Sequence, residues 1–158
     1  MEIEIGALLK EKNFTISCAE SCTGGLLTDK LTNVPGASAY VKGAIVSYTN
    51  EIKISALHVN EETLNKFGAV SEQTAREMAV NVRQIMNTDI GISITGIAGP
   101  AGGTAETPLG LIYVGVSGSN GDRVQKFKFS GDRVEIKNKA VEVALVFLNI
   151  YLTLEKNF

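Results

Sequence analysis

The residues most capable of chemistry lie in the stretch 19–25, which reads AESCTGG and contains two hydroxyls, one thiol and one carboxylate. The residues before it suit a short buried strand, and the leucines after it have the spacing of an amphipathic helix. Ser21, Cys22 and Thr23 are therefore expected at a strand-to-helix junction, where free N–H groups and the helix dipole stabilise anions. A serine hydroxyl there is placed as a nucleophile would be. The alternative is that Ser21 or Thr23 only caps the helix.

The same junction contains two glycines and a second nucleophile candidate. Gly24 and Gly25 are poor helix formers, so their place in a first turn indicates close approach by a ligand or another backbone. Cys22 is the rival of Ser21, because the pKa of a thiol falls at a helix N-terminus. Its alternative is a small buried side chain without a chemical role.

A nucleophilic serine needs a proton acceptor, and a single histidine, His58, at the start of a loop argues against a histidine-based triad. A serine–lysine pair remains, provided that burial lowers the lysine pKa enough to expose a free amine. Lys53 is the best candidate, one turn after an expected strand end at residues 48–50; a solvated surface charge is its alternative. Tyr48 could pass or hold the Ser21 proton, or be a core aromatic with a hydrated hydroxyl.

Composition predicts one globular domain over residues 1–158, since 44% of the residues are hydrophobic and 20% are charged. The formal net charge of −2 gives no electrostatic footprint for nucleic acid or an acidic membrane. The apolar runs are too short to span a bilayer, and the N-terminus lacks a signal-peptide pattern. Two cysteines and one histidine cannot build an ordinary zinc site, so we expect no metal, no cofactor and a cytoplasmic protein with reduced thiols.

Hydrophobic periodicity divides the chain into alternating helices and strands. Helical spacing covers residues 2–12, 26–31, 51–57, 61–66, 72–87 and 133–153, with apolar stripes at Ala75, Met78, Ala79, Val82 and Ile85 and at Val141, Ala144, Leu145, Leu148 and Tyr151. Strand patterns cover the first half of 15–25 and residues 44–48, 90–94, 109–116 and 124–129, the last two joined by a turn at 117–123. The expected N-caps are Asn50, Asn60, Ser71 and Asp132, the last in a capping box with Glu135.

This alternation with one hairpin predicts a three-layer α/β/α sandwich around a mixed, mainly parallel sheet. Sites in such sheets lie where strands end, and Ser21, Tyr48 and Thr95 each lie at an expected strand end. The stretch 95–103 contains four glycines and one proline, which indicates a loop. The Thr95 hydroxyl and glycine amides of this loop could cradle a ligand; a loop that only crosses between elements is the alternative.

Several of these motifs, in this order, resemble the CinA C-terminal domain family, the nicotinamide-nucleotide amidases. The resemblance covers about residues 5–152. The motifs that carry it are AESCTGG at 19–25, YTN at 48–50 followed by Lys53, TGIAGP at 95–100, GAIV at 43–46, GAVS at 68–71 and GDR at 131–133.

The resemblance implies hydrolysis of the carboxamide of nicotinamide mononucleotide to nicotinate mononucleotide and ammonia, by an α/β/α domain with a five-stranded mixed sheet that is usually a homodimer. A larger N-terminal domain precedes this one in many relatives, so the chain resembles the stand-alone form. The resemblance favours Ser21 as nucleophile and Lys53 as base, with Tyr48 beside them. It also implies substrate contacts from Glu20, Thr23, Gly24, Gly25, Asn50, Thr95, Gly96, Gly99, Gly102 and Arg133.

Arg133 would hold the 5′-phosphate in a charge-assisted fork at the N-terminus of the last helix; a solvent-facing arginine is its alternative. Glu20 could orient Lys53, bind the ribose, or simply be solvated. Two positions depart from the family pattern, since Thr107 and Lys137 stand where relatives often have lysine and arginine. These departures favour the alternative that the domain binds a nucleotide or dimerises with weak turnover or none.

Overall fold

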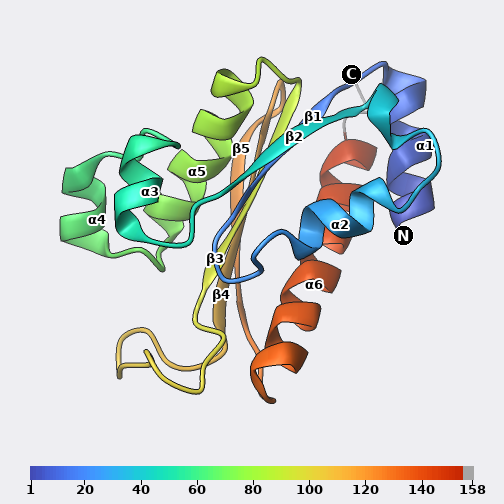
Figure 1. Cartoon of the computed structure of the whole chain (residues 1–158). Coiled ribbons are helices and arrows are strands. Elements are labelled where there is room, and N and C mark those ends of the chain that lie inside the picture. Colours follow the sequence, from blue (N-terminus) through green and yellow to red (C-terminus); the bar gives the residue numbers. More distant parts are fainter. Residues whose placement is uncertain (155–158) are drawn as a thin grey trace.

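The computed structural model describes residues 1–154 and arranges them as one five-stranded sheet between two layers of helices (Figure 1). The strands are β1 (Ile16–Glu20), β2 (Val41–Val46), β3 (Ile90–Gly96), β4 (Leu111–Gly118) and β5 (Gly121–Lys128). The helices are α1 (Glu2–Lys12), α2 (Leu26–Thr32), α3 (Asn50–Ser55), α4 (Glu61–Phe67), α5 (Glu72–Ile85) and α6 (Arg133–Leu154), with a 3-10 turn η1 (Ala37–Ala39). The expected α/β/α sandwich is confirmed.

The sheet has the strand order β2-β1-β3-β4-β5. β1 pairs in parallel with β2 and with β3, whereas β3 with β4 and β4 with β5 are antiparallel. Only β4 therefore runs against the other strands, so the sheet is mixed and mainly parallel, as expected. The carboxyl ends of β1, β2 and β3 meet at one end of the sheet, which is where ligands bind in open α/β sheets.

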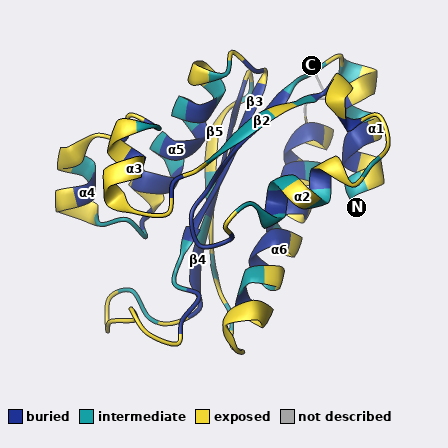
Figure 2. Cartoon of the chain, in the orientation of Figure 1, coloured by how far each residue is buried: buried dark blue, intermediate teal, exposed yellow. Residues whose placement is uncertain are grey.

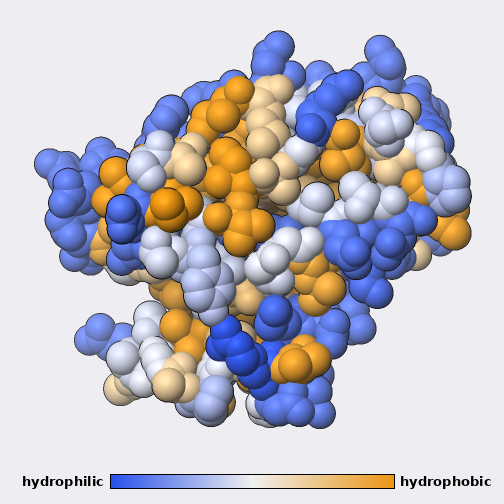
Figure 3. Space-filling model, viewed as in Figure 1, coloured by the Kyte–Doolittle hydropathy of each residue, from blue (hydrophilic) through white to orange (hydrophobic). Residues whose placement is uncertain are grey.

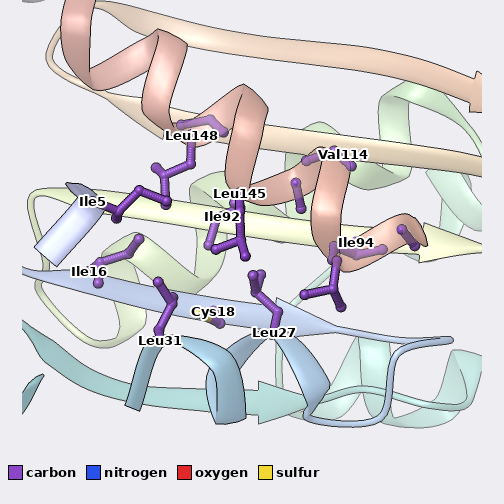
Figure 4. Close-up of a cluster of buried hydrophobic side chains, with 14 of the residues drawn as sticks. Ile5, Ile16, Cys18, Leu27, Leu31, Ile92, Ile94, Val114, Leu145 and Leu148 are labelled. Atoms are coloured by element: carbon purple, nitrogen blue, oxygen red, sulfur yellow. The ribbon is translucent and has the colours of Figure 1, made fainter. Parts of the chain in front are cut away.

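The helices form two layers, and one layer covers each face of the sheet. α1, α2 and α6 lie on one face, and α3, α4 and α5 lie on the other (Figure 1). β1, β3 and β4 are buried along almost their whole length, because both of their faces are covered (Figure 2). The larger apolar cluster lies on the first face and includes Ile16, Ile92 and Leu145 (Figure 4).

On the second face α5 approaches β3 and β4 closely at two glycines. A Cβ added to Gly91 would lie 2.1 Å from the carbonyl oxygen of Ala79, and one added to Gly115 would lie 2.6 Å from that of Ala75. Ser93 Oγ donates to the Ala75 carbonyl at 2.6 Å. Small side chains and one buried hydroxyl therefore hold this helix directly against the strands that lead to the site.

The predicted buried face of the last helix is confirmed, since Val141, Ala144, Leu145, Leu148 and Tyr151 are all buried. The predicted caps at Asn60, Ser71 and Asp132 are confirmed too. The side chains of Asn60 and Ser71 accept hydrogen bonds from N–H groups of α4 and α5. Asp132 Oδ1 accepts from the Glu135 N–H at 2.9 Å, and Glu135 Oε2 accepts from the Asp132 N–H at 3.2 Å. None of the helices within residues 1–154 is both long and apolar enough to cross a membrane.

The strand predicted at 44–48 is displaced. β2 is paired with β1 from Val41 to Val46, so residues 47 and 48 follow the strand. The predicted cap at Asn50 is wrong, because Thr49 Oγ1 accepts from the Ile52 N–H at 3.3 Å and Asn50 is the first helical residue.

Three further boundaries differ from the prediction. β3 continues to Gly96, since Thr95 and Gly96 pair with β4, and the loop predicted from residue 95 begins at Ile97. The hairpin turn is shorter than 117–123, because β4 and β5 stay paired up to Gly118 and Gly121. Ile85 is 42% exposed at the end of α5 and does not belong to the buried stripe.

Candidate active site

Ser21 lies immediately after β1, at the strand-to-helix junction expected for it. Its backbone N–H donates to the Ile94 carbonyl at 3.0 Å, which ties the turn to β3. Gly24 and Gly25 have φ angles of 63° and 108°, a left-handed conformation that glycine adopts without strain. The turn therefore keeps Ser21 outside α2 and leaves its side chain at the end of the sheet.

The carboxylate of Glu20 organises this turn from inside the protein. Glu20 is fully buried, and its Oε1 accepts from Thr23 Oγ1 at 2.6 Å and from the Leu27 N–H at 2.9 Å. Its Oε2 accepts from the Thr28 N–H at 3.0 Å and from Thr28 Oγ1 at 2.6 Å. These bonds satisfy N–H groups of the first turn of α2 and place a negative charge at the positive end of the helix.

Two sequence interpretations are corrected by this arrangement. Glu20 is neither solvated nor free to bind a ribose, because its four hydrogen bonds hold α2 in place. Thr23 points at Glu20 and not at the pocket. Neither Ser21 nor Thr23 caps the helix, since the capping oxygens come from Glu20.

Lys53 is brought to Ser21 by α3, the short helix that follows β2. Its Nζ donates to Ser21 Oγ at 2.9 Å and to the Ser47 carbonyl oxygen at 2.8 Å. The side chain is only 2% exposed, and no carboxylate within residues 1–154 forms an ion pair with it. The alternative of a solvated surface charge is therefore wrong, and the structure places the serine beside a buried lysine.

Burial lowers the pKa of Lys53 from 10.5 to about 8. The negative charge of a Cys22 thiolate would act in the opposite direction, but more weakly. With this pKa, about a tenth of the Lys53 side chains carry a neutral amine at pH 7 and about half at pH 8. A neutral amine can accept the hydroxyl proton, so the geometry and the pKa both suit a general base for Ser21.

Cys22 lies at the same turn but has the wrong ionisation for a nucleophile. Burial raises the pKa of its thiol to about 11, which outweighs the lowering expected from the helix end. At pH 7 the thiolate is then about one molecule in ten thousand. The structure thus favours the reading of Cys22 as a small buried side chain.

A pocket of about 210 Å³ opens beside Ser21 and is formed by four separate segments of the chain. Its lining residues are Ser21 and Cys22 after β1, Tyr48 after β2, residues 96–99 and 101 around the end of β3, and Arg133 at the start of α6. The site therefore lies at the carboxyl ends of the parallel strands and is completed by the last helix.

Arg133 and Tyr48 form the rim of this pocket. Arg133 Nη1 donates to the Gly99 carbonyl at 2.6 Å, and Nη2 donates to the Tyr48 hydroxyl oxygen. Tyr48 is 56% exposed, so its alternative as a core aromatic is wrong. Within the described residues the Ser21 hydroxyl is bonded to Lys53 and not to Tyr48. A proton-transfer role for Tyr48 stays a prediction.

The ligand cradle predicted from residues 95–103 is smaller than expected. Gly96 and Gly99 line the pocket. Thr95 is fully buried, and its hydroxyl donates to a carbonyl in the turn before α5 at 2.8 Å, so it does not contribute. Gly102 and Asn50 are exposed and lie outside the lining. Their predicted substrate contacts have no support in this arrangement.

The sequence interpretation missed one residue of the site, Ser47, and gave too little weight to another, Lys137. Ser47 supplies the carbonyl that holds Lys53, and its position directly before Tyr48 at a strand end was the available signal. Lys137 was noted only as a departure from the family pattern. Its Nζ lies 3.9 Å from the position of a Cβ added to Gly24, so α6 directs a second cation toward the turn.

Fold and site together define an α/β protein with a buried serine–lysine pair beside a small pocket, an arrangement suited to attack on a carbonyl carbon. Within residues 1–154 no three or more His, Cys, Asp and Glu side chains are grouped to hold a metal ion. The chain belongs to the CinA C-terminal domain family, whose model matches residues 1–152.

Curated relatives support this assignment. A CinA-like protein of Kosmotoga olearia is 51% identical over 141 residues, which are 89% of this chain and 34% of that protein. A CinA-like protein of Sulfurihydrogenibium sp. is 46% identical over 152 residues, which are 96% of this chain and 38% of that protein. The chain thus spans little more than a third of the length of the curated relatives it matches.

Solved structures share the fold over nearly their whole length. Competence damage-inducible protein A from Klebsiella pneumoniae has a TM-score of 0.93 at 32% identity, covering 96% of this chain and 94% of that chain. The competence/damage inducible protein CihA from Agrobacterium tumefaciens has a TM-score of 0.88 at 38% identity, covering 95% of this chain and 96% of that chain.

Proposed function

We propose that this chain hydrolyses the carboxamide of nicotinamide mononucleotide to nicotinate mononucleotide and ammonia, with Ser21 as nucleophile. The observation that carries the proposal is the 2.9 Å hydrogen bond between Nζ of buried Lys53 and Ser21 Oγ. Membership of the CinA C-terminal domain family supports the substrate class. An arginine on the pocket rim supports a ligand with a phosphate.

The acyl ester forms with two proton transfers through Lys53. The neutral amine takes the Ser21 proton as Oγ bonds to the carboxamide carbon, which gives a tetrahedral intermediate. The Lys53 ammonium then protonates the departing nitrogen, the carbon–nitrogen bond breaks and ammonia leaves. Water attacks the resulting acyl ester with Lys53 again as base, and the Ser21 hydroxyl is restored. A lysine pKa near working pH suits both directions of transfer.

The developing oxyanion needs N–H donors close to the attacking oxygen. The backbone N–H groups of Cys22 and Thr23 follow the nucleophile directly, and neither bonds to a backbone carbonyl within residues 1–154. They lie in the turn that leads into α2, where the helix dipole favours negative charge. We assign them as the donors.

The substrate would enter with its amide first and its phosphate last. A volume of about 210 Å³ suits the pyridine ring and carboxamide, while the ribose and phosphate lie along the open rim. Arg133 uses Nη1 and Nη2 for Gly99 and Tyr48, which leaves further N–H groups of the guanidinium for a phosphate. Lys137 adds a positive charge nearby.

The test is release of ammonia and nicotinate mononucleotide from nicotinamide mononucleotide by the purified chain, with Ser21→Ala as the inactive control. Calorimetric titration with the same nucleotide is run in parallel. Binding without any product would replace the proposal with the alternative, a nucleotide-binding or dimerisation domain, which the departures at Thr107 and Lys137 favour. If the nucleotide neither binds nor reacts, the amidase proposal and a nucleotide-binding role are both refuted, and only the dimerisation role is left.

We also propose a homodimer in the cytoplasm, where the free thiols Cys18 and Cys22 would stay reduced. Apolar side chains gather over the edge strand β2, where Val46 is 44% exposed (Figure 3). The opposite edge strand, β5, has charged side chains that discourage pairing, among them Arg123 and Lys126. This asymmetry supports self-association at β2, and light scattering on the eluting protein tests it: a monomeric mass refutes the homodimer.

A further inference from the structure

Ser47 is a fully buried serine whose hydroxyl has no hydrogen-bond partner within residues 1–154. Its backbone is well used, because its N–H donates to the Glu20 carbonyl at 2.8 Å and its carbonyl accepts from Lys53 Nζ at 2.8 Å. A buried hydroxyl without a partner is less favourable than the methyl group of alanine. A serine at this position therefore indicates a partner in another state of the site.

The sheet register places this hydroxyl on the same side as the candidate nucleophile. Glu20 is paired with Val46, so Ser21 and Ser47 are the first residues after two neighbouring parallel strands and follow a matched pair. Side chains alternate along a strand, and Ala19 packs into the apolar cluster beneath α5. Ser21 and Ser47 continue that face, toward the layer that contains α3.

Counting donors shows what the site lacks once Lys53 is charged. A neutral amine has two N–H groups and a lone pair; an ammonium has three N–H groups and needs three acceptors. The Ser47 carbonyl and Ser21 Oγ account for two of them. Within residues 1–154 these are the hydrogen bonds that Nζ makes, and no carboxylate pairs with it, so the third hydrogen of a buried ammonium has no acceptor in this arrangement.

We infer that the Ser47 hydroxyl is the third acceptor of the Lys53 ammonium, and that Ser47 is a positioning residue that holds the protonated lysine between its two proton transfers. The Ser47 carbonyl already lies 2.8 Å from Nζ, so we expect a change of the Ser47 χ1 rotamer to bring Oγ within reach of the ammonium. In the first proton transfer of the proposed reaction, which produces this ammonium, the Ser21 O–H bond breaks and an Nζ–H bond forms. The two transfers rest on the proposed function, whereas the hydrogen bond to the ammonium forms without substrate.

The effect of the Ser47 hydroxyl on the titration of Lys53 can be measured apart from the effects of the neighbouring titratable and charged groups. Cys22 acts on the titration of Lys53 directly, and Tyr48 and Arg133 line the same pocket. Glu20, at the end of β1, and Lys137, on α6, act in turn on Cys22. All of them are retained in a Ser47 variant. A changed titration of Lys53 in that variant therefore reports the hydroxyl.

The experiment is an NMR titration of lysine labelled at Cε, in the protein without substrate, with the Lys53 signal assigned by its loss in Lys53→Arg. We expect Ser47→Ala to lower the pKa of Lys53 by about one unit, since the ammonium loses an acceptor. At about pH 10, where Lys53 is neutral and the Ser47 hydroxyl has no partner, its thermal midpoint should be equal to or above that of the wild type. The matched control is Ser93→Ala, whose Oγ donates to the Ala75 carbonyl at 2.6 Å. It should lower the midpoint and leave the Lys53 titration unchanged.

Ser47→Cys serves as a second variant if the alanine protein does not fold, because a thiol is a similar size and a weak acceptor. A Lys53 pKa within about 0.3 unit of wild type in the folded variant, or a raised one, overturns the inference. If the wild-type chain releases ammonia but the titration does not move, this inference fails and the proposed function stands. If the titration moves and no ammonia is released, the Ser47 assignment stands and the proposed function fails.

Discussion

Replacing Lys53 by methionine is expected to stabilise the fold while abolishing the reaction. The pKa of Lys53 is 10.5 in an unfolded chain and about 8 in the fold. At pH 7 this difference means that burying the ammonium costs about 3 kcal/mol. Methionine has a similar length and no charge. After about 1 kcal/mol for the lost hydrogen bonds to Ser21 and Ser47, we expect a net gain of about 2 kcal/mol at pH 7.

The sign of the pH dependence separates this explanation from ordinary packing effects. Between pH 8 and pH 10.5 the unfolded chain binds more protons at Lys53 than the fold does, so the free energy of unfolding of the wild type rises with pH. The advantage of Lys53→Met should therefore shrink to near zero by about pH 10. Urea unfolding followed by circular dichroism measures both proteins across this range. Lys66→Met, at an exposed position on α4, is the control and should show no such trend.

The kinetic part of the same prediction uses the proposed substrate. Below pH 8 the neutral fraction of Lys53 grows about tenfold per pH unit, so kcat/KM should rise with that slope and level off above about pH 9. Lys53→Arg should be as inactive as Lys53→Met, because a guanidinium does not release its proton. A methionine variant that is less stable than wild type at pH 7, with a pH-independent difference, would refute the reasoning.

Three further predictions concern the turn and the rim. Ser21→Ala should abolish product formation with nucleotide binding retained, whereas Cys22→Ala should keep most activity; a folded but inactive Cys22→Ala protein would make the thiol the nucleophile. Arg133→Ala should lower kcat/KM by about ten- to a hundredfold, mainly through KM, because a remote phosphate contact helps ground and transition state alike. Equal losses on nicotinamide riboside, which has no phosphate, would contradict that role. Glu20→Gln should lower the free energy of unfolding by about 2 kcal/mol or more in urea titrations, because an amide cannot accept the four hydrogen bonds of the carboxylate; an unchanged value would contradict its capping role.

The parts of the site predicted from the sequence depended on local signals. The strand, glycine and leucine pattern around Ser21 places a hydroxyl at a helix start wherever the turn lies in the fold. The shortage of histidine left lysine as the base, and the order of the motifs pointed to Lys53. The alternating elements predicted the layers, and the capping box at Asp132 located the start of α6.

The errors concern which way side chains point, which depends on distant partners. Glu20 and Thr23 lie in the same short motif as Ser21, but only the packing of α2 shows that they face inward. Thr95 was assigned to a loop because glycines follow it, whereas pairing with β4 extends the strand and turns the hydroxyl toward α5. Ser47 was overlooked because the contact that the structure shows with Lys53 comes from its backbone carbonyl, which a residue of any type could supply.

Two backbone hydrogen bonds hold the base of the loop between β3 and β4, so the length of the loop does not affect the geometry of the Ser21–Lys53 pair. The Gly110 N–H donates to the Ile97 carbonyl at 2.8 Å, and the Ile97 N–H donates to the Leu111 carbonyl at 2.9 Å. Residues 102–106 beyond these bonds are exposed and lie outside the pocket lining. Insertions and deletions there leave the Ser21–Lys53 pair in place, so this segment is free to diverge and to change which molecules reach the rim, at little cost to folding.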